Sequence, residues 1–394
     1  MYKKLLQPLL LLLALTWSGE LTAPELPASY SELAPVLPSR ETLKAVDEFD
    51  QYIQQAVNQG QVPGAAVAIV QNGRVLLTKG YGRRSANKKD PVDAHTIFRI
   101  ASLSKSFAAF LTSRLAEKAV LQLNDPVVKY LPDLCLKSDE QTKRLLLSNL
   151  LSHTTGFPYH TYTDLIELGK TIPEIMPLLG NVNLIGKEGT VYSYQNAVFS
   201  LIGEVISAAT GHSYEENLQN EVFTPLGMAD ASVTLQGFLS NPNAAMPHQG
   251  SGYGHWRQLA PSPKYYNAAP AGGVNASAED MAKYLLAMLG NRPDVISAES
   301  LSQLGEARIK TPVRYRYFNN WKNLDKVSYG LGWRVLDLGH GETILYHGGF
   351  VNGYRSEIAV FPKKGIGICV LFNSATDISD ECIPKFLASL PETP

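Results

Sequence analysis

A serine and a lysine stand one helical turn apart in this chain, at Ser102 and Lys105. Apolar residues recur after them at spacings of three and four, which predicts a helix with Ser102 at its N-terminus. An amine on that helix can lower the pKa of the serine hydroxyl or take its proton, and the helix N-terminus favours an oxyanion. Ser102 and Lys105 are therefore candidate catalytic residues, and the plain alternative is a serine that only caps the helix.

The same four-residue spacing occurs a second time, at Ser85 and Lys88. These two residues lie in a polar run ahead of Pro91, which is typical of a solvated loop. We therefore predict that Ser102, and not Ser85, is the nucleophile.

A second candidate segment contains Tyr194 and Asn196, directly before an apolar helix predicted over residues 196–209. A tyrosine can act as a base if neighbouring cations lower its pKa from about 10, and an asparagine side chain both donates and accepts hydrogen bonds. The same spacing recurs at Tyr265 and Tyr317. Tyr194 is preferred because the helix that follows fixes its loop, although a packing role is the alternative.

A third segment, His347, Gly348, Gly349 and Phe350, ends a predicted strand. The two glycines would let another segment approach the strand closely, and the backbone N–H of the next residue could point at a developing oxyanion. A β-bulge or sharp turn is the alternative interpretation.

These residues must be positioned by secondary-structure elements, and the sequence pattern predicts that the two ends of the chain form one sheet. An amphipathic helix around residues 43–57 precedes a hairpin over 65–79, and strands are expected at 332–338, 343–346, 355–361 and 365–373, followed by a helix near 378–390. The middle is mostly helical, with helices expected at 145–151, 196–209 and 278–289. We expect an α/β fold of the α+β type: an antiparallel sheet flanked by helices, with an inserted, mostly helical lobe and Ser102 in the cleft between them.

The N-terminal residues resemble an export signal. Lys3 and Lys4 precede an apolar run over 5–17 that is short for a membrane span. We predict a signal peptide or N-terminal anchor over 1–19, a proline-rich linker over 20–40 and one domain over 41–394. Within that domain the sheet lobe covers about 41–85 plus 326–394 and the helical lobe about 86–325. The expected location is periplasmic or secreted.

Composition excludes several classes of protein. With 45% hydrophobic residues the chain can bury a large core. A formal net charge of −1 without a basic cluster argues against a protein that binds nucleic acid. The three cysteines, Cys135, Cys369 and Cys382, leave at least one thiol free. No histidine spacing is typical of a metal site, so no metal or cofactor is expected. The expected partner is a small-molecule substrate, with membrane contact only through an uncleaved N-terminal segment.

Together these motifs resemble a known family. Ser102 with Lys105, Tyr194 with Asn196, and the His347-Gly348-Gly349 run, in that order, are similar to the three active-site motifs of class C β-lactamases and related penicillin-recognising serine hydrolases. The resemblance covers nearly the whole chain, through segments beginning at Val62, Leu123, Leu151, Leu226, Ala271, Tyr329 and Phe372.

The resemblance implies roles for these residues. Ser102 would be acylated, Lys105 and Tyr194 would share the proton transfers, and Asn196 would hold the substrate amide. The backbone N–H groups of Ser102 and Phe350 would form the oxyanion hole. The loop that contains His153 matches a family loop with an expected structural role.

One departure bears on the substrate. True β-lactamases of this class have Lys-Thr-Gly where this chain has His347, Gly348 and Gly349, so a fixed charge and a hydroxyl are replaced, and carboxylate-bearing β-lactams should bind less well. Arg355 could restore a cation, although an exposed strand arginine is the simpler account. The prediction is an exported serine hydrolase of small amides, esters or peptides. The alternatives are a true class C-type β-lactamase or D,D-peptidase, and an inactive protein that binds peptides or cell-wall fragments.

Overall fold

The structure is a computed structural model that describes residues 37–250, 254–312, 318–322, 324–339 and 341–391. The predicted export signal and most of the predicted linker lie outside the described residues. Among the described residues no helix is both long enough and apolar enough to cross a membrane.

The centre of the described fold is an antiparallel sheet of eight strands in the order β2-β1-β12-β11-β10-β9-β8-β7. Its members are β1 (Gly64–Gln71), β2 (Arg74–Gly82), β7 (Ile309–Lys310), β8 (Lys326–Tyr329), β9 (Arg334–Asp337), β10 (Thr343–Val351), β11 (Tyr354–Phe361) and β12 (Ile366–Phe372). Because β1 pairs with β12, the two ends of the chain form one sheet, as the sequence predicted. Two small ladders lie outside it, β3 (Phe98–Arg99) with β6 (Asn275–Ala276) and β4 (His248–Gly250) with β5 (Trp256–Gln258).

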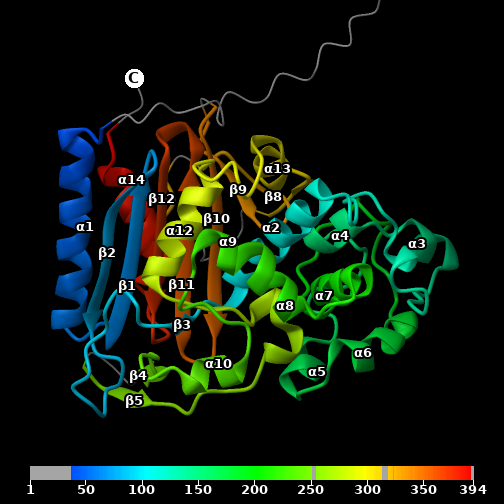
Figure 1. Ribbon diagram of the computed structural model, residues 1–394, viewed down its shortest axis with the longest axis horizontal. Helices are drawn as coiled ribbons and strands as arrows, with labels where there is room; N and C mark the ends of the chain where they lie inside the picture. Colours follow the sequence, from blue (N-terminus) through cyan, green and yellow to red (C-terminus); the bar gives the residue numbers. More distant parts are fainter. Residues whose placement is uncertain (1–36, 251–253, 313–317, 323, 340, 392–394) are drawn as a thin grey trace, which may run out of the picture.

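Helices cover both faces of this sheet (Figure 1). On one face α1 (Arg40–Asn58) contacts β2, and α14 (Ser379–Ser389) contacts β11 and β12. On the other face α12 (Ala278–Met288) contacts β1 and β12, beside the helical lobe. The remaining helices are α2 (Ser104–Glu117), α3 (Asp139–Arg144), α4 (Leu147–Leu151), α5 (Thr163–Glu167), α6 (Ile172–Ile175), α7 (Ala197–Thr210), α8 (Tyr214–Leu218), α9 (Thr224–Leu226), α10 (Leu235–Ser240), α11 (Ala269–Gly272) and α13 (Ala298–Leu304).

Shorter helical turns join these elements. The 3₁₀ turns are η2 (Ala101–Leu103), η3 (Val127–Lys129), η4 (Met176–Asn181), η6 (Tyr266–Ala268) and η8 (Pro362–Lys364), and η5 (Gln219–Phe223) is a π-helical turn. The turn η2 carries the predicted nucleophile and contacts β10 and β11.

Alternation along the strands gives the sheet two apolar layers. In β1, Ala66, Ala68 and Val70 pack in the core shared with the helical lobe, whereas Val67 and Ile69 pack against the layer of α1 and α14. Successive strand residues point to opposite faces, so a central strand covered on both faces reads as a continuous apolar run.

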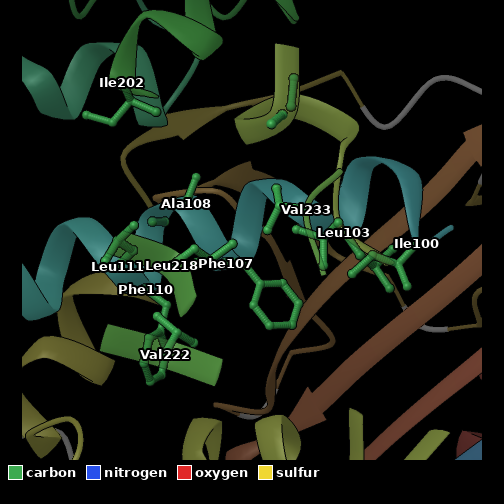
Figure 2. Close-up of a cluster of buried hydrophobic side chains, with 14 of the residues drawn as sticks. Ile100, Leu103, Phe107, Ala108, Phe110, Leu111, Ile202, Leu218, Val222 and Val233 are labelled. Atoms are coloured by element: carbon green, nitrogen blue, oxygen red, sulfur yellow. The ribbon is translucent and has the colours of Figure 1, made fainter. Parts of the chain in front are cut away.

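Helix α2 lies inside the core of the helical lobe. Figure 2 shows Phe107, Phe110 and Leu111 of α2 among apolar neighbours that include Ile202 of α7 and Val222 of η5. All five side chains are buried. Because close-packed interiors permit little rearrangement, α2 is a rigid support for whatever its N-terminal turn presents.

Several element boundaries differ from those predicted. Strand β10 continues to Val351, past the expected end at Tyr346, and β9 begins at Arg334 rather than at residue 332. Gly332 has a φ of +71°, and an added Cβ there would collide with the carbonyl oxygen of Lys105. This glycine forms a turn against α2, so the strand starts only after it.

Candidate active site

The predicted nucleophile lies in the 3₁₀ turn η2, just before α2, rather than within the helix itself. Ala101, the residue before Ser102, has a φ of +50°. A left-handed conformation costs an L-residue roughly 1–2 kcal/mol, and such strain is often found at functional sites. The strained residue turns the chain sharply, so that Ser102 opens the turn that leads into α2.

Strand β10 holds that turn in place through Gly349. A Cβ on Gly349 would collide with the Ser356 hydroxyl and would lie 2.6 Å from the carbonyl oxygen of Ile100. In the structure the Ser356 hydroxyl donates to that carbonyl oxygen at 2.7 Å. The predicted close approach at the glycines therefore occurs at Gly349, and the segment that approaches is the one that carries Ser102.

The Lys105 amine is fully buried and has three polar neighbours. Its Nζ lies 2.8 Å from Oδ1 of Asn196, 2.8 Å from the carbonyl oxygen of Ala271 and 3.4 Å from Oγ of Ser102. A neutral amine has two N–H donors and one lone pair. Since the Asn196 and Ala271 oxygens can only accept, they take the two donors, and the lone pair faces the Ser102 hydroxyl.

Electrostatics favour that neutral amine. Burial, with a further contribution from the positive charge of Arg334, lowers the pKa of Lys105 well below its ordinary value. A lysine whose amine is neutral near pH 7 can accept the serine proton, as a general base must.

Tyr194 reaches the same serine from the other side. Its hydroxyl donates to Oγ of Ser102 at 3.0 Å, and Nζ of Lys105 lies 4.8 Å from the centre of its ring. His153 braces its loop: the backbone N–H of Gln195 donates to His153 Nδ1 at 3.3 Å, and the His153 and Tyr194 ring centres are 4.3 Å apart. Burial lowers the pKa of His153 well below its ordinary value, so its imidazole ring is neutral. This arrangement supports the structural role expected for His153.

Strand β10 borders the site in the segment after Tyr346, where it is no longer paired with β9. Strand β9 pairs with β10 only from Thr343 to Tyr346. The turn that follows Val351 has two residues, Asn352 (φ +37°) and Gly353 (φ +84°), as in a type I′ hairpin. In such a hairpin the flanking pair is hydrogen-bonded and hydrogen-bonded pairs then alternate.

This alternation orients the backbone of β10 at the site. Val351 and Gly349 direct their backbone groups to β11, whereas Gly348 and Phe350 direct theirs to the opposite edge. The Phe350 N–H therefore faces away from β11, toward the edge of β10 that is no longer paired with β9 after Tyr346. The Phe350 side chain itself is 59% exposed. The role that the resemblance implies for this N–H, in an oxyanion hole, stays a prediction.

His347 is buried, and both of its ring nitrogens have protein partners. Nδ1–H donates to the carbonyl oxygen of Gly348 at 2.8 Å, and the Tyr329 hydroxyl donates to Nε2 at 3.0 Å. Burial, with the charge of Arg334, lowers the pKa of His347 well below its ordinary value. The ring is thus neutral, and it supports the strand rather than offering a charge to substrate.

The competing residues have other partners. The Ser85 hydroxyl donates to Oε1 of Gln258. Nη2 of Arg355 lies 3.2 Å from Oδ1 of Asp380 on α14, so this cation is paired away from the serine. The Tyr265 hydroxyl donates to Oε1 of Glu167 at 3.2 Å. The third repeat, at Tyr317, lies outside the described residues.

Two members of the site were not identified from the sequence. Ala271 contributes only its carbonyl oxygen, which no side-chain pattern can reveal. Arg334 lies beyond the Tyr329 segment, which the sequence singled out without a role, and its guanidinium carbon is 5.9 Å from the centre of the Tyr194 ring. The three thiols are also placed: Cys369 and Cys382 are buried, Cys135 is exposed, and all three are free.

Comparisons with known proteins agree with this fold. A family model described as Beta-lactamase matches residues 49–388. A solved structure, the octameric penicillin-binding protein homologue from Pyrococcus abyssi, is similar with a TM-score of 0.75 and 27% identity, over 88% of this chain and 78% of that one.

Curated relatives are similar over most of the chain. Protein flp of Staphylococcus aureus strain N315 is 27% identical over 358 residues, which are 89% of this chain and 67% of that protein. Unguisins hydrolase ungD' of Aspergillus campestris is 26% identical over 346 residues, which are 83% of this chain and 61% of that protein. The chain thus spans about two thirds of the length of these relatives.

Proposed function

The chain belongs to the Beta-lactamase family, and from this premise we propose that it is a serine hydrolase that forms an acyl-enzyme on Ser102. The observation that carries the proposal is the convergence of two proton-transfer groups on one hydroxyl. Nζ of Lys105 is 3.4 Å from Oγ of Ser102, and the Tyr194 hydroxyl is 3.0 Å from the same atom.

The residues divide the acylation step between them. The Ser102 hydroxyl gives its proton to neutral Lys105 as Oγ bonds to the substrate carbonyl carbon, and the backbone N–H groups of Ser102 and Phe350 receive the oxyanion. Tyr194 protonates the leaving amine or alcohol as its bond to carbon breaks, and the Lys105 ammonium returns a proton to Tyr194. Water then attacks the acyl-enzyme by the reverse sequence of proton transfers and frees Ser102.

Asn196 fits a substrate-holding role in this scheme. Its Oδ1 accepts from Lys105 at 2.8 Å, so its amide N–H groups are the part of the side chain that can donate to a substrate carbonyl. The proposed substrates are small amides, esters or peptides. One relative, from Aspergillus campestris, is named a hydrolase, which supports hydrolysis rather than pure binding.

The test is intact-mass spectrometry of the protein mixed with a p-nitrophenyl ester, a fluorescent penicillin or a D-alanyl peptide. We expect an adduct or turnover that disappears in Ser102→Ala and persists in the matched control Ser85→Ala. The substrate that reacts best separates an esterase from a β-lactamase or a D,D-peptidase. Absence of both adduct and turnover with all three would favour a binding protein, and loss of reaction in Ser85→Ala alone would overturn the assignment.

Export is a further part of the proposal, based on the charged start and apolar run of the first 19 residues. We expect the full chain, expressed in a bacterium, to appear outside the cytoplasm with its mass reduced by a cleaved signal, or held at the membrane uncleaved. Recovery of the intact chain in the cytoplasm would contradict export.

A further inference from the structure

Tyr265 lies in a loop that is held from two sides. The guanidinium of Arg99, which is buried in β3, donates at 2.8 and 2.6 Å to two carbonyl oxygens within residues 262–264. On the other side Nδ2 of Asn267 donates at 2.9 Å to the carbonyl oxygen of Ile166 in α5. Tyr265 itself has a φ of +70°, a strained conformation that persists only where the surroundings hold it.

The Tyr265 hydroxyl lies between a carboxylate and the amide of the site. It donates to Oε1 of Glu167 at 3.2 Å, and a side-chain hydrogen bond also joins it to Asn196. Because an ionised carboxylate only accepts, the hydroxyl proton goes to Glu167, and Asn196 must be the donor through Nδ2. Burial, with the charge and hydrogen bond of Glu167, raises the pKa of Tyr265 to about 12, and the bond from Asn196 opposes this rise, as a donor does.

Helix α11 brings this tyrosine close to the base. A Cβ on Gly272 would lie only 3.2 Å from Cβ of Tyr265, so the absence of a side chain lets the tyrosine pack closely there. The neighbouring residue, Ala271, supplies the carbonyl oxygen that accepts from Lys105 at 2.8 Å. Tyr265 therefore packs against the same helix that holds the lysine amine.

We propose that Tyr265 and Glu167 are positioning residues that fix the orientation of the Asn196 amide. This inference rests on the proposed acyl-enzyme chemistry. Glu167 takes the hydroxyl proton, so an oxygen lone pair of Tyr265 faces Nδ2 of Asn196. Oδ1 of Asn196 then faces Nζ of Lys105, at 2.8 Å. In the opposite orientation Nδ2 would donate to the lone pair of Lys105, which could no longer accept the Ser102 proton.

The test measures kcat/KM for p-nitrophenyl acetate in the wild-type protein, Tyr265→Phe, Glu167→Gln and the double variant. This ester has no amide group for Asn196 to hold, so a loss arises at the base. Tyr265→Phe removes only the hydroxyl. Glu167→Gln reverses the hydroxyl, because Nζ of Lys264, 3.2 Å from Oε2 of Glu167, can only donate. The glutamine oxygen therefore faces the lysine, and its NH₂ group faces Tyr265.

The expected result is a rescue in the double variant. Tyr265→Phe should lower kcat/KM at neutral pH about 10-fold, and Glu167→Gln should lower it on the order of 10- to 100-fold. Adding Tyr265→Phe to Glu167→Gln should restore the rate to that of Tyr265→Phe, because the carboxylate acts only through the hydroxyl. The matched control is Tyr266→Phe, which removes a neighbouring hydroxyl that donates to Oδ1 of Asn275 at 2.7 Å and should keep the wild-type rate.

The pH profile of Tyr265→Phe separates positioning from structural support. An ammonium at Lys105 has only donors and keeps Oδ1 of Asn196 facing it, so rotation of the amide removes only the neutral base. A 10-fold lower plateau should therefore come with an acidic limb about one pH unit lower, and the two proteins should have equal rates at acidic pH. The other titratable groups around Lys105 are unchanged in this variant: Tyr194, His153, His160, Arg334 and His347.

Three outcomes would overturn the inference without touching the proposed function. They are an unchanged rate in either single variant, losses that multiply in the double variant, and a lower plateau in Tyr265→Phe without the shift of the acidic limb. In each of them Ser102-dependent hydrolysis by the wild-type protein remains. Failure of the proposed function looks different, because the wild-type protein would then not cleave the ester in a Ser102-dependent way.

Discussion

The hydrogen-bond partners of the Lys105 amine determine which chemistry is available to Ser102. Lys105 faces two oxygens that can only accept, and its third direction points to the serine hydroxyl. This arrangement suits a neutral amine, because an ammonium here would be buried with no carboxylate partner among the described residues. Burial is thus the means by which an ordinary lysine becomes a base at neutral pH.

The first prediction concerns the pH dependence of acylation. Because the pKa of Lys105 is lowered, the neutral base is present from a pH well below the usual lysine value of 10.5. We expect kcat/KM to be level around neutrality and to fall on the acidic side as Lys105 takes up a proton. In Lys105→Ala, kcat/KM should fall on the order of 10²- to 10⁴-fold and this acidic limb should disappear.

The measurement is a pH–rate profile for a neutral ester with both proteins. Tyr194→Phe is the companion variant, which should also slow acylation but keep the acidic limb, because the base remains. A limb that survives in Lys105→Ala would assign the titration to another group.

At the scale of elements, the position of Ser102 depends on contact between η2 and β10. Gly349 has no side chain, so the Ile100 carbonyl and Ala101 can lie directly against the strand. The same strand carries Phe350, whose N–H faces away from β11 and is proposed for the oxyanion hole. Strand β10 therefore fixes the position of the η2 turn that carries Ser102 and, in the proposed mechanism, the position of the oxyanion.

The second prediction is that Gly349→Ala moves β10 and η2 apart. Its Cβ would collide with the Ser356 hydroxyl and approach the Ile100 carbonyl oxygen to 2.6 Å, so β10 or η2 must move. We expect a loss of about 1–3 kcal/mol in the free energy of unfolding, as for other overpacked sites. Ester hydrolysis should fall by a much larger factor than this loss of stability explains. Denaturant unfolding and ester kinetics measure the two effects.

A matched control is Gly339→Ala. Gly339 has a φ of +78° and open space around an added Cβ, so this variant strains the backbone far from the serine. It should lose about 1 kcal/mol of stability and keep its activity. If Gly349→Ala keeps its activity as well, β10 does not set the position of Ser102.

At the scale of the whole molecule, the sheet carries a buried carboxyl group on the face that α1 and α14 cover. Glu357 of β11 is fully buried, and the Tyr346 hydroxyl donates to its Oε2 at 2.6 Å. Desolvation by burial raises the pKa of Glu357 to about 8. This group is protonated in the folded protein at neutral pH, whereas in the unfolded chain it ionises near its ordinary value of 4.5.

The third prediction follows from that difference, with a definite sign. The folded state binds the proton more tightly, so the contribution to stability is complete below about pH 4.5 and is lost as the pH rises to about 8. Over this window the free energy of unfolding should fall by an amount on the order of a few kcal/mol. Glu357→Gln, which cannot ionise, should flatten the decline, as urea unfolding at several pH values would show. Glu299→Gln, at an exposed position on α13, should follow the wild-type curve, and an unchanged slope in Glu357→Gln would show that other groups cause it.

Local patterns predicted much of the fold. The hairpin over 65–79, the helix over 196–209 and the pairing of the first and last strands were all predicted, because turn residues and apolar periodicity act over short distances. The start of β9 was misplaced because Gly332 turns against the carbonyl of Lys105, a contact between residues more than 200 positions apart. Such packing leaves no local signal.

By itself, the sequence determined which groups are available: a serine and a lysine on one helical turn, a tyrosine and an asparagine ahead of a helix, and a glycine-rich strand end, in an order that resembles one family. Tertiary structure alone decided their states and partners. It buries Lys105 and His347 so that both are neutral, pairs Arg355 with Asp380, and brings Arg334 to the ring of Tyr194. The physical reason is that residue types and short spacings are written along the chain, whereas charge states and contacts depend on desolvation and on neighbours that only folding brings together.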